Sequence, residues 1–217
     1  MNENSILHQC LIENKNFRNK DSWFANLNFI CENTPNQNLL NSLKGPLNVK
    51  LNISHLQIKF KEWWYKRLFD DKQTEHGNKL RNYRTYKNKF IKEEYLNTIQ
   101  LKEHRGSIAR LRLSCHKLHI ETGRFAKKES KLLPSERLCK LCNINECEDE
   151  FHFVIKCNLY SEKRNVLMVK LKELYPHVNT LVDTELFIWL MANLDSKVIS
   201  LLSKYISECF KIRISHQ

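Results

Sequence analysis

The stretch LCKLCNINECEDEFHFVIKCNLY, from Leu138 to Tyr160, contains four of the eight cysteines of the chain and one histidine. Within it, the spacing C-x2-C-x9-H-x4-C is formed by Cys139, Cys142, His152 and Cys157. Two cysteines three positions apart make a tight loop that offers both sulfurs to one ion, and the later histidine and cysteine can complete a tetrahedron. A closed set of four protein ligands leaves no position for a substrate. The segment therefore predicts one structural Zn²⁺, on which the local fold is expected to depend.

A second ligand set is present in the same stretch. Cys139, Cys142, Cys147 and His152 are separated by two, four and four residues. This is the spacing of a retroviral zinc knuckle with its last two ligand types exchanged, and it would leave Cys157 unused. From the spacing alone, Cys157 and Cys147 remain alternative fourth ligands.

The separation between His152 and Cys157 constrains the local backbone. Residues five apart on an ideal helix point about 140° away from each other. The two side chains can converge only if the turn between them is distorted or ends. Acidic side chains are favourable at a helix N-terminus, so Glu148, Asp149 and Glu150 are expected to begin the turn that carries His152. One of the three is also expected to orient the second ring nitrogen of that histidine.

The composition predicts a mainly α-helical chain. Among 217 residues there are only four glycines and four prolines, which favours long helices with few tight turns. The expected fold is a helical array with a small embedded zinc-binding loop-helix segment. We divide the chain into a weakly patterned segment at 1–50, a basic helical region at 51–130, and a zinc-binding segment with C-terminal helices at 131–217. Apolar periodicity predicts helices reaching residue 70, then over 79–89, 101–118, 161–175 and 183–214, the last with a break near Asn193.

Positive charge is concentrated in one third of the chain. The net charge is +12, and the stretch from Lys59 to Lys131 alone has 20 Lys and Arg against 9 Asp and Glu. Such a cluster indicates an anionic partner, nucleic acid above all, although a solvated basic surface gives the same pattern. The candidate phosphate contacts are Arg81, Arg84, Lys87, Arg105, Arg112, Arg124, Lys127 and Lys128. The candidate stacking residues are Trp63, Trp64, Tyr83 and Tyr86.

The remaining cysteines and the N-terminal residues bear on the compartment. Residues 1–12 lack the pattern of a secretory signal, and no apolar segment reaches the roughly 18–20 residues that span a bilayer. We therefore expect an intracellular protein, nuclear or cytoplasmic and without a membrane partner. In such a reducing compartment, clustered cysteines indicate a metal site. The scattered Cys10, Cys31, Cys115 and Cys209 are expected to be small buried hydrophobes. Cys115 should then be a core residue beside surface histidines, His116 and His119.

Several short motifs give the chain a family resemblance. It resembles the segment that follows the polymerase in non-LTR retrotransposon proteins of aquatic invertebrates and fish. The matching pieces are KLRNYRTYK at 79–87, LSCHKL at 113–118, IETGR at 120–124, Arg137 with Cys139 and Cys142, EDEFHF at 148–153, and Cys157 with Tyr160 and Arg164. The resemblance implies a reverse-transcriptase-associated zinc-binding domain whose ligands correspond to Cys139, Cys142, His152 and Cys157. It also implies a role in gripping RNA or DNA beside an upstream polymerase.

Catalytic residues are not apparent. A reverse transcriptase requires paired aspartates on a hairpin, and the only adjacent pair, Asp70-Asp71, follows an amphipathic, tryptophan-rich helix pattern. No spacing unites a nucleophile with a base, and no small-molecule substrate is indicated. We therefore expect a non-catalytic zinc-binding module that binds nucleic acid, as the tail of a retrotransposon reverse transcriptase or a fragment derived from one. The alternative is a module in which zinc supports a protein-protein interface.

Overall fold

A computed structural model describes residues 58, 60–66, 68–69, 79–87, 89–125 and 132–216. The chain divides into two compact units, Met1–Asp70 and Asp71–Gln217. In the first unit, the residues at 60–66 and 68–69 are helical, as the amphipathic pattern there predicts. Leu68 is buried, and the rings of Phe60 and Trp63 stack with centroids 5.4 Å apart. The predicted segment at 1–50 and the predicted boundary at 130 fall outside the described residues, so the three-part division stays a prediction.

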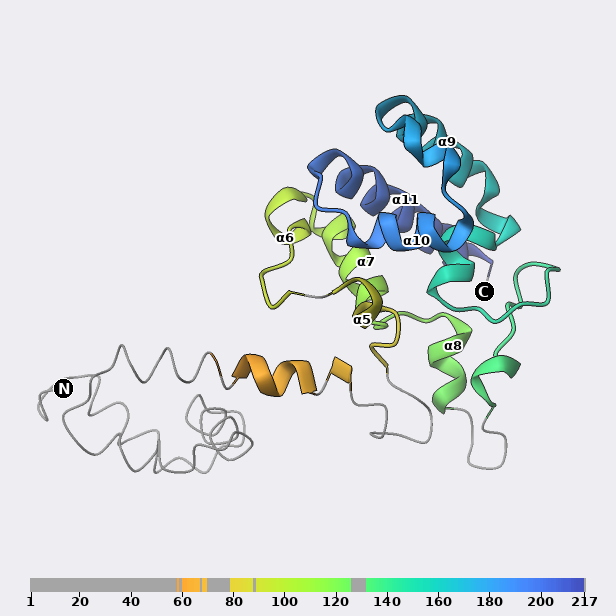
Figure 1. The fold of residues 1–217 in the computed structure, drawn as a ribbon. Helices are drawn as coiled ribbons and strands as arrows, with labels where there is room; N and C mark the ends of the chain where they lie inside the picture. The colour runs from red at the N-terminus through yellow and green to blue at the C-terminus, as the bar shows by residue number, and fades with distance from the viewer. Residues whose placement is uncertain are drawn as a thin grey trace, which may run out of the picture. The chain divides into compact units, whose positions relative to one another are not determined.

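The second unit is built from helices (Figure 1). Its described residues contain no strand, only an isolated antiparallel bridge between Leu138 and Cys147. The mainly helical fold class is therefore confirmed. The α-helices are α5 (Tyr83–Tyr86), α6 (Tyr95–Thr98), α7 (Lys102–Arg112), α8 (His119–Thr122), α9 (Ser161–Leu174), α10 (Asp183–Ala192) and α11 (Ser196–Ser215). Short 3-10 turns lie at Gly123–Phe125, Pro134–Glu136, Asn158–Tyr160 and Pro176–Thr180, and a π-helical turn lies at His152–Lys156.

Helix α11 is the centre of the core. It packs against α7, α9 and α6, and the ribbon shows it crossing behind α10 (Figure 1). Leu202 and Ile206 of α11 are almost completely buried, as are Ile108 and Leu111 of α7 and Leu171 of α9. These side chains fall at helical spacing along each element, so one apolar stripe per helix builds a shared core. The helices predicted at 161–175 and at 183–214 are confirmed. The predicted break near Asn193 is confirmed too, and the Asp195 side chain accepts a hydrogen bond from the Lys197 backbone to cap α11.

Helix α7 ends earlier than its apolar pattern predicts. The expected helix over 101–118 stops at Arg112, because Ser114 adopts a left-handed conformation with φ of 50°. The N–H of Cys115 donates to the Arg110 carbonyl at 2.8 Å, and the N–H of Ser114 donates to the Leu111 carbonyl at 3.2 Å. This pair of bonds is a Schellman cap, which satisfies the last carbonyls of the helix. The predicted helix over 79–89 is likewise reduced to α5, which spans only Tyr83–Tyr86.

No single helix in the described part of the chain is long and apolar enough to cross a membrane. Helices α10 and α11 reach the length and apolar composition of a membrane span only when taken together, and the pair is bent by 109° between them.

A buried arginine fixes the chain just before the first two predicted zinc ligands. Arg137 is 1% exposed, and its guanidinium donates to the carbonyls of Ile120 at 2.7 Å and Leu132 at 2.9 Å. The aliphatic part of its side chain lies against Gly123, where a Cβ would come within 2.8 Å of both Cγ and Cδ of Arg137. Gly123 is therefore needed for space, since its own φ of −65° is open to any residue.

Replacing Gly123 by alanine is expected to destabilise the protein by about 1–3 kcal/mol, because the new methyl group overpacks against an arginine held by three hydrogen bonds. Gly106, in the middle of α7, offers a matched control, since nothing lies within 4 Å of its Cβ position. Gly106→Ala is expected to stabilise the protein by roughly 0.5–1 kcal/mol through helix propensity. Urea unfolding of the two variants measures both changes, and equal effects of the two substitutions would contradict the proposed clash.

Candidate metal centre

Four side chains from two segments converge on one point. One donor atom from each of Cys139, Cys142, His152 and Cys157 lies within 4.8 Å of the other three. Cys142 Sγ is 3.3 Å from His152 Nε2. A tetrahedral zinc ion with three sulfur ligands and one nitrogen ligand has ligand-to-ligand edges of roughly 3.5–3.8 Å. The described part of the chain therefore has one Cys3His group that can hold a metal ion, and its donor set suits zinc.

The first half of the group is a tight hairpin. Cys139 N–H donates to the Glu146 carbonyl at 2.8 Å, and Glu148 N–H donates to the Arg137 carbonyl at 2.9 Å. The reversal between them is completed by Asn145, whose φ of 58° lies in the left-handed region that asparagine tolerates. Hydrogen bonds from the backbone of Leu141 and Ile144 reach the sulfurs of Cys139 and Cys142. Such amides favour the thiolate form that binds a metal.

Cys147 lies outside the group. It is paired with Leu138 in the hairpin, so it shares a face with Leu138 and not with the neighbouring Cys139. Its thiol donates to the Pro134 carbonyl at 3.1 Å, and burial raises its pKa to about 11. The knuckle-like ligand set that contains Cys147 is therefore not assembled in this structure.

The second half of the group depends on a distorted turn. Residues His152–Lys156 form a π-helical turn in which Cys157 N–H donates to the His152 carbonyl at 2.8 Å. This i+5 hydrogen bond widens the turn and brings the two ligands onto one side, which confirms the distortion that their spacing predicts. At Cys157 the backbone leaves the helix with ψ of 122°, and a separate helix, α9, begins at Ser161.

An acidic residue orients the histidine ligand. Glu146 Oε2 lies 3.2 Å from His152 Nδ1, while Nε2 faces Cys142. This assigns the proton to Nδ1 and leaves the Nε2 lone pair for the metal. The expectation that Glu148, Asp149 or Glu150 would bind the ring was wrong. Asp149 instead accepts the backbone N–H of His152 at 2.8 Å, as an acid at a helix start does.

The thiols influence each other's ionisation. A hydrogen bond from Cys157 lowers the pKa of Cys139 to about 3, while the same bond raises the pKa of Cys157. Burial raises the pKa of Cys142, and the neighbouring Cys139 thiolate adds to the rise. Three negative sulfurs at this distance repel each other unless a cation lies between them. Zinc binding is therefore expected to release protons from the group.

The candidate phosphate contacts are distributed over several environments. Lys87 and Arg112 are buried, and both pair with Glu93, at 2.6 and 2.8 Å, so their charges are used inside the protein. Arg81 is also engaged internally, with Glu121 and Glu150, each at 2.6 Å. Arg124 pairs with Glu121 at 2.9 Å, Arg105 donates to the Ile99 carbonyl, and Arg84 is half-buried; Lys127 and Lys128 lie outside the described residues.

The histidine and cysteine beside α7 exchange the roles that the sequence predicts. His116 is buried and bonded to Glu150, whereas Cys115 is exposed. Cys209 is buried, as expected, while Cys10 and Cys31 fall outside the described residues. The sequence did single out Glu150, as part of an acidic run, but its partners lie 34 to 69 positions away and have no local signal.

No protein family model, curated protein or solved structure matches this chain. Its described residues form a mainly helical fold that contains a Cys3His group in a loop region.

Proposed function

We propose that the chain is a non-catalytic zinc-binding module that binds nucleic acid, as the tail of a retrotransposon reverse transcriptase or a fragment derived from one. The closed Cys3His group is the observation that carries the proposal. Four protein ligands fill the coordination sphere of zinc, so the ion supports structure and has no open position for chemistry.

The motifs of the family resemblance have specific uses around this group. Gly123 makes room for Arg137, which leads into the cysteine hairpin. Arg164, at the other end of the motif, donates to the carbonyls of Cys157 at 2.6 Å and Val154 at 3.0 Å, which fixes the end of the π-helical turn. Gly123, Arg137 and Arg164, which match the family motif, therefore support the segments that carry the four ligands, and this supports the resemblance.

The basic region supports nucleic acid as the partner. Exposed cations remain there after the internal ion pairs are set aside, on α7 and in the segments before and after it; these are Lys79, Lys89, Lys92, Lys102, Arg110 and Lys117. An exposed positive surface of this kind attracts phosphate without regard to base sequence. The zinc-supported protein interface remains the second candidate, because Val166 and Val169, three residues apart on α9, are 57% and 56% exposed.

The zinc-loaded chain is expected to bind RNA or DNA oligonucleotides with an affinity that falls steeply as salt rises. If about six phosphates are contacted, raising the salt from 50 to 200 mM weakens binding on the order of 10³-fold. Replacing Lys89 and Arg110 together by glutamine should weaken binding and reduce the salt slope by about two. Lys197→Gln, on α11 outside the basic region, is the control. Absence of binding at 50 mM salt, or a salt-independent affinity, would contradict the nucleic-acid proposal and favour the protein interface.

A further inference from the structure

Two buried carboxylates lie on the short segment that joins the two halves of the metal centre. Glu148 is 3% exposed and Glu150 is 1% exposed, and both lie between Cys142 and His152 in the chain. A buried carboxylate is costly unless it is paired and hydrogen-bonded. Each accepts hydrogen bonds at its carboxylate, and the donors of these bonds come from other parts of the second unit.

Glu148 joins the hairpin to α8 and to the end of α11. Its Oε2 accepts the N–H of His119 at 2.6 Å and a guanidinium N–H of Arg213 at 2.9 Å. Its carbonyl accepts the N–H of Ile120, and its own N–H binds Arg137. One residue thus fixes the start of α8 and the last turn of the central helix relative to the cysteine hairpin.

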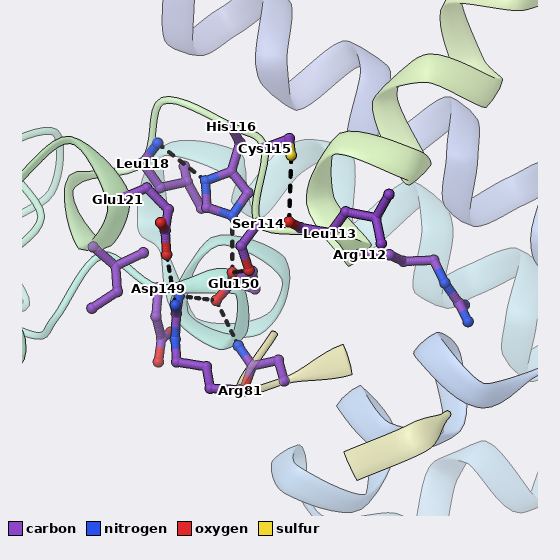
Figure 2. A network of polar contacts seen from close by, with 12 residues as sticks. Arg81, Arg112, Leu113, Ser114, Cys115, His116, Leu118, Glu121, Asp149 and Glu150 are labelled. Carbon is purple, nitrogen blue, oxygen red and sulfur yellow. Dashed lines mark hydrogen bonds and ion pairs between the residues drawn. The ribbon is translucent and has the colours of Figure 1, made fainter. Parts of the chain in front are cut away.

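Glu150 is the centre of a second network (Figure 2). Its Oε1 accepts from Ser114 Oγ at 2.6 Å and from His116 Nε2 at 2.9 Å, while Oε2 accepts from Arg81 Nη2 at 2.6 Å and from Asn82 Nδ2 at 2.5 Å. Ser114 is the left-handed residue that ends α7, so the carboxylate also holds a conformation that serine adopts only at a cost.

Glu150 lies on the same turn as the candidate metal ligand that follows it. His152 is two residues further along, and Asp149 between the carboxylates accepts the His152 backbone N–H. Metal binding to His152 therefore restrains the same turn that presents Glu150. If the turn relaxes, the side chains of Arg81, Ser114 and His116 lose the carboxylate that accepts their hydrogen bonds. Their polar groups then need other hydrogen-bond partners.

We propose that the metal centre works as a latch on the basic region: zinc binding at Cys139, Cys142, His152 and Cys157 fixes Glu148 and Glu150, and these carboxylates then order the segments at 81–86 and 112–121 and the end of α11. The proposal rests on zinc binding to this group as proposed above. Because coupling between two sites is reciprocal, breaking the carboxylate network must also weaken zinc binding.

Hydrogen exchange and zinc competition on the full chain test the latch. Removal of zinc with a chelator is expected to accelerate exchange at 81–86 and 112–121 more than at 198–206 in the middle of α11. Glu150→Gln is expected to lower zinc affinity by roughly 5- to 150-fold, the usual range for such coupling. Arg81→Gln keeps the carboxylate and removes one of its partners, 69 positions away, and should also lower zinc affinity. This variant tests the proposal if the Glu150→Gln protein does not fold.

Leu202→Ala is the matched control, since Leu202 is 1% exposed and does not belong to either network. It should lower stability and leave zinc affinity near that of the wild type. The latch is overturned if the wild type binds zinc and chelation leaves exchange at 81–86 and 112–121 unchanged. It is also overturned if Leu202→Ala lowers zinc affinity as much as Glu150→Gln, which would indicate general loosening. Failure of the wild type to bind zinc would instead reject the zinc module itself.

Discussion

Replacing Cys157 by serine is expected to abolish tight zinc binding, whereas Cys147→Ser is expected to leave one zinc per chain. Cys157 is 1% exposed and belongs to the converging group of four donors. Cys147 has its thiol on the Pro134 carbonyl and lies on the other face of the hairpin. Each variant replaces one sulfur atom with oxygen, and both positions lie in the same segment, so each variant controls for the other.

The effect of Cys157→Ser on stability should be large. Structural zinc contributes on the order of 10–16 kcal/mol to the folding of small zinc modules, and a serine hydroxyl is a poor replacement for a thiolate. The expected result is loss of ordered structure over 132–160 at temperatures where the wild type and Cys147→Ser remain folded. Zinc content per chain, measured on protein purified under reducing conditions, decides the matter together with thermal unfolding. Loss of zinc only in Cys147→Ser would select the knuckle-like set and reject the ligand assignment.

The ligands and the C-terminal helices could be predicted because their signals are local. The spacing of Cys139, Cys142 and His152 indicates three ligands of one ion but leaves Cys147 and Cys157 as alternatives for the fourth. The need for a distorted turn between His152 and Cys157 follows from helix geometry alone. Helices α9 to α11 follow from apolar periodicity, since each contributes one stripe to the core. Glu146 was missed because it precedes the acidic run and reaches His152 by reversal of the hairpin.

The early end of α7 and the burial of two cations could not be predicted, because they depend on tertiary contacts that no local periodicity indicates. Ser114 leaves the helix with its hydroxyl on Glu150, 36 positions further on. His116 has one ring nitrogen on the same carboxylate and accepts the Leu118 N–H at the other. Charge patterning treats every lysine and arginine as solvent-facing, whereas Lys87 and Arg112 are each 7% exposed. Tertiary pairing with Glu93, which no local pattern indicates, decides their role.

Arg112 should therefore behave as a core residue, and Arg112→Met is expected to destabilise the protein by about 3–5 kcal/mol, since it leaves a half-buried carboxylate short of its main partner. The guanidinium donates to Glu93 at 2.8 Å and to the Met191 carbonyl. Its carbon lies 4.7 Å from the ring centroid of Tyr86 and 5.6 Å from that of Tyr95. Although burial would raise the pKa of Glu93, the charge of Arg112 and a hydrogen bond from Lys87 hold it below its usual range.

Arg110 provides the comparison for Arg112, two positions earlier on the same helix. It is exposed, donates to the Gly106 carbonyl at 3.2 Å, and has its guanidinium 5.9 Å from the Phe210 ring centroid. Arg110→Met should therefore cost less than about 1 kcal/mol. Urea unfolding with zinc present, together with oligonucleotide binding at low salt, separates the two roles that a basic residue can have here. If Arg112 is internal, the Arg112→Met protein loses stability and the Arg110→Met protein loses affinity for nucleic acid. If Arg112 binds phosphate, the Arg112→Met protein instead keeps its stability and loses affinity for nucleic acid.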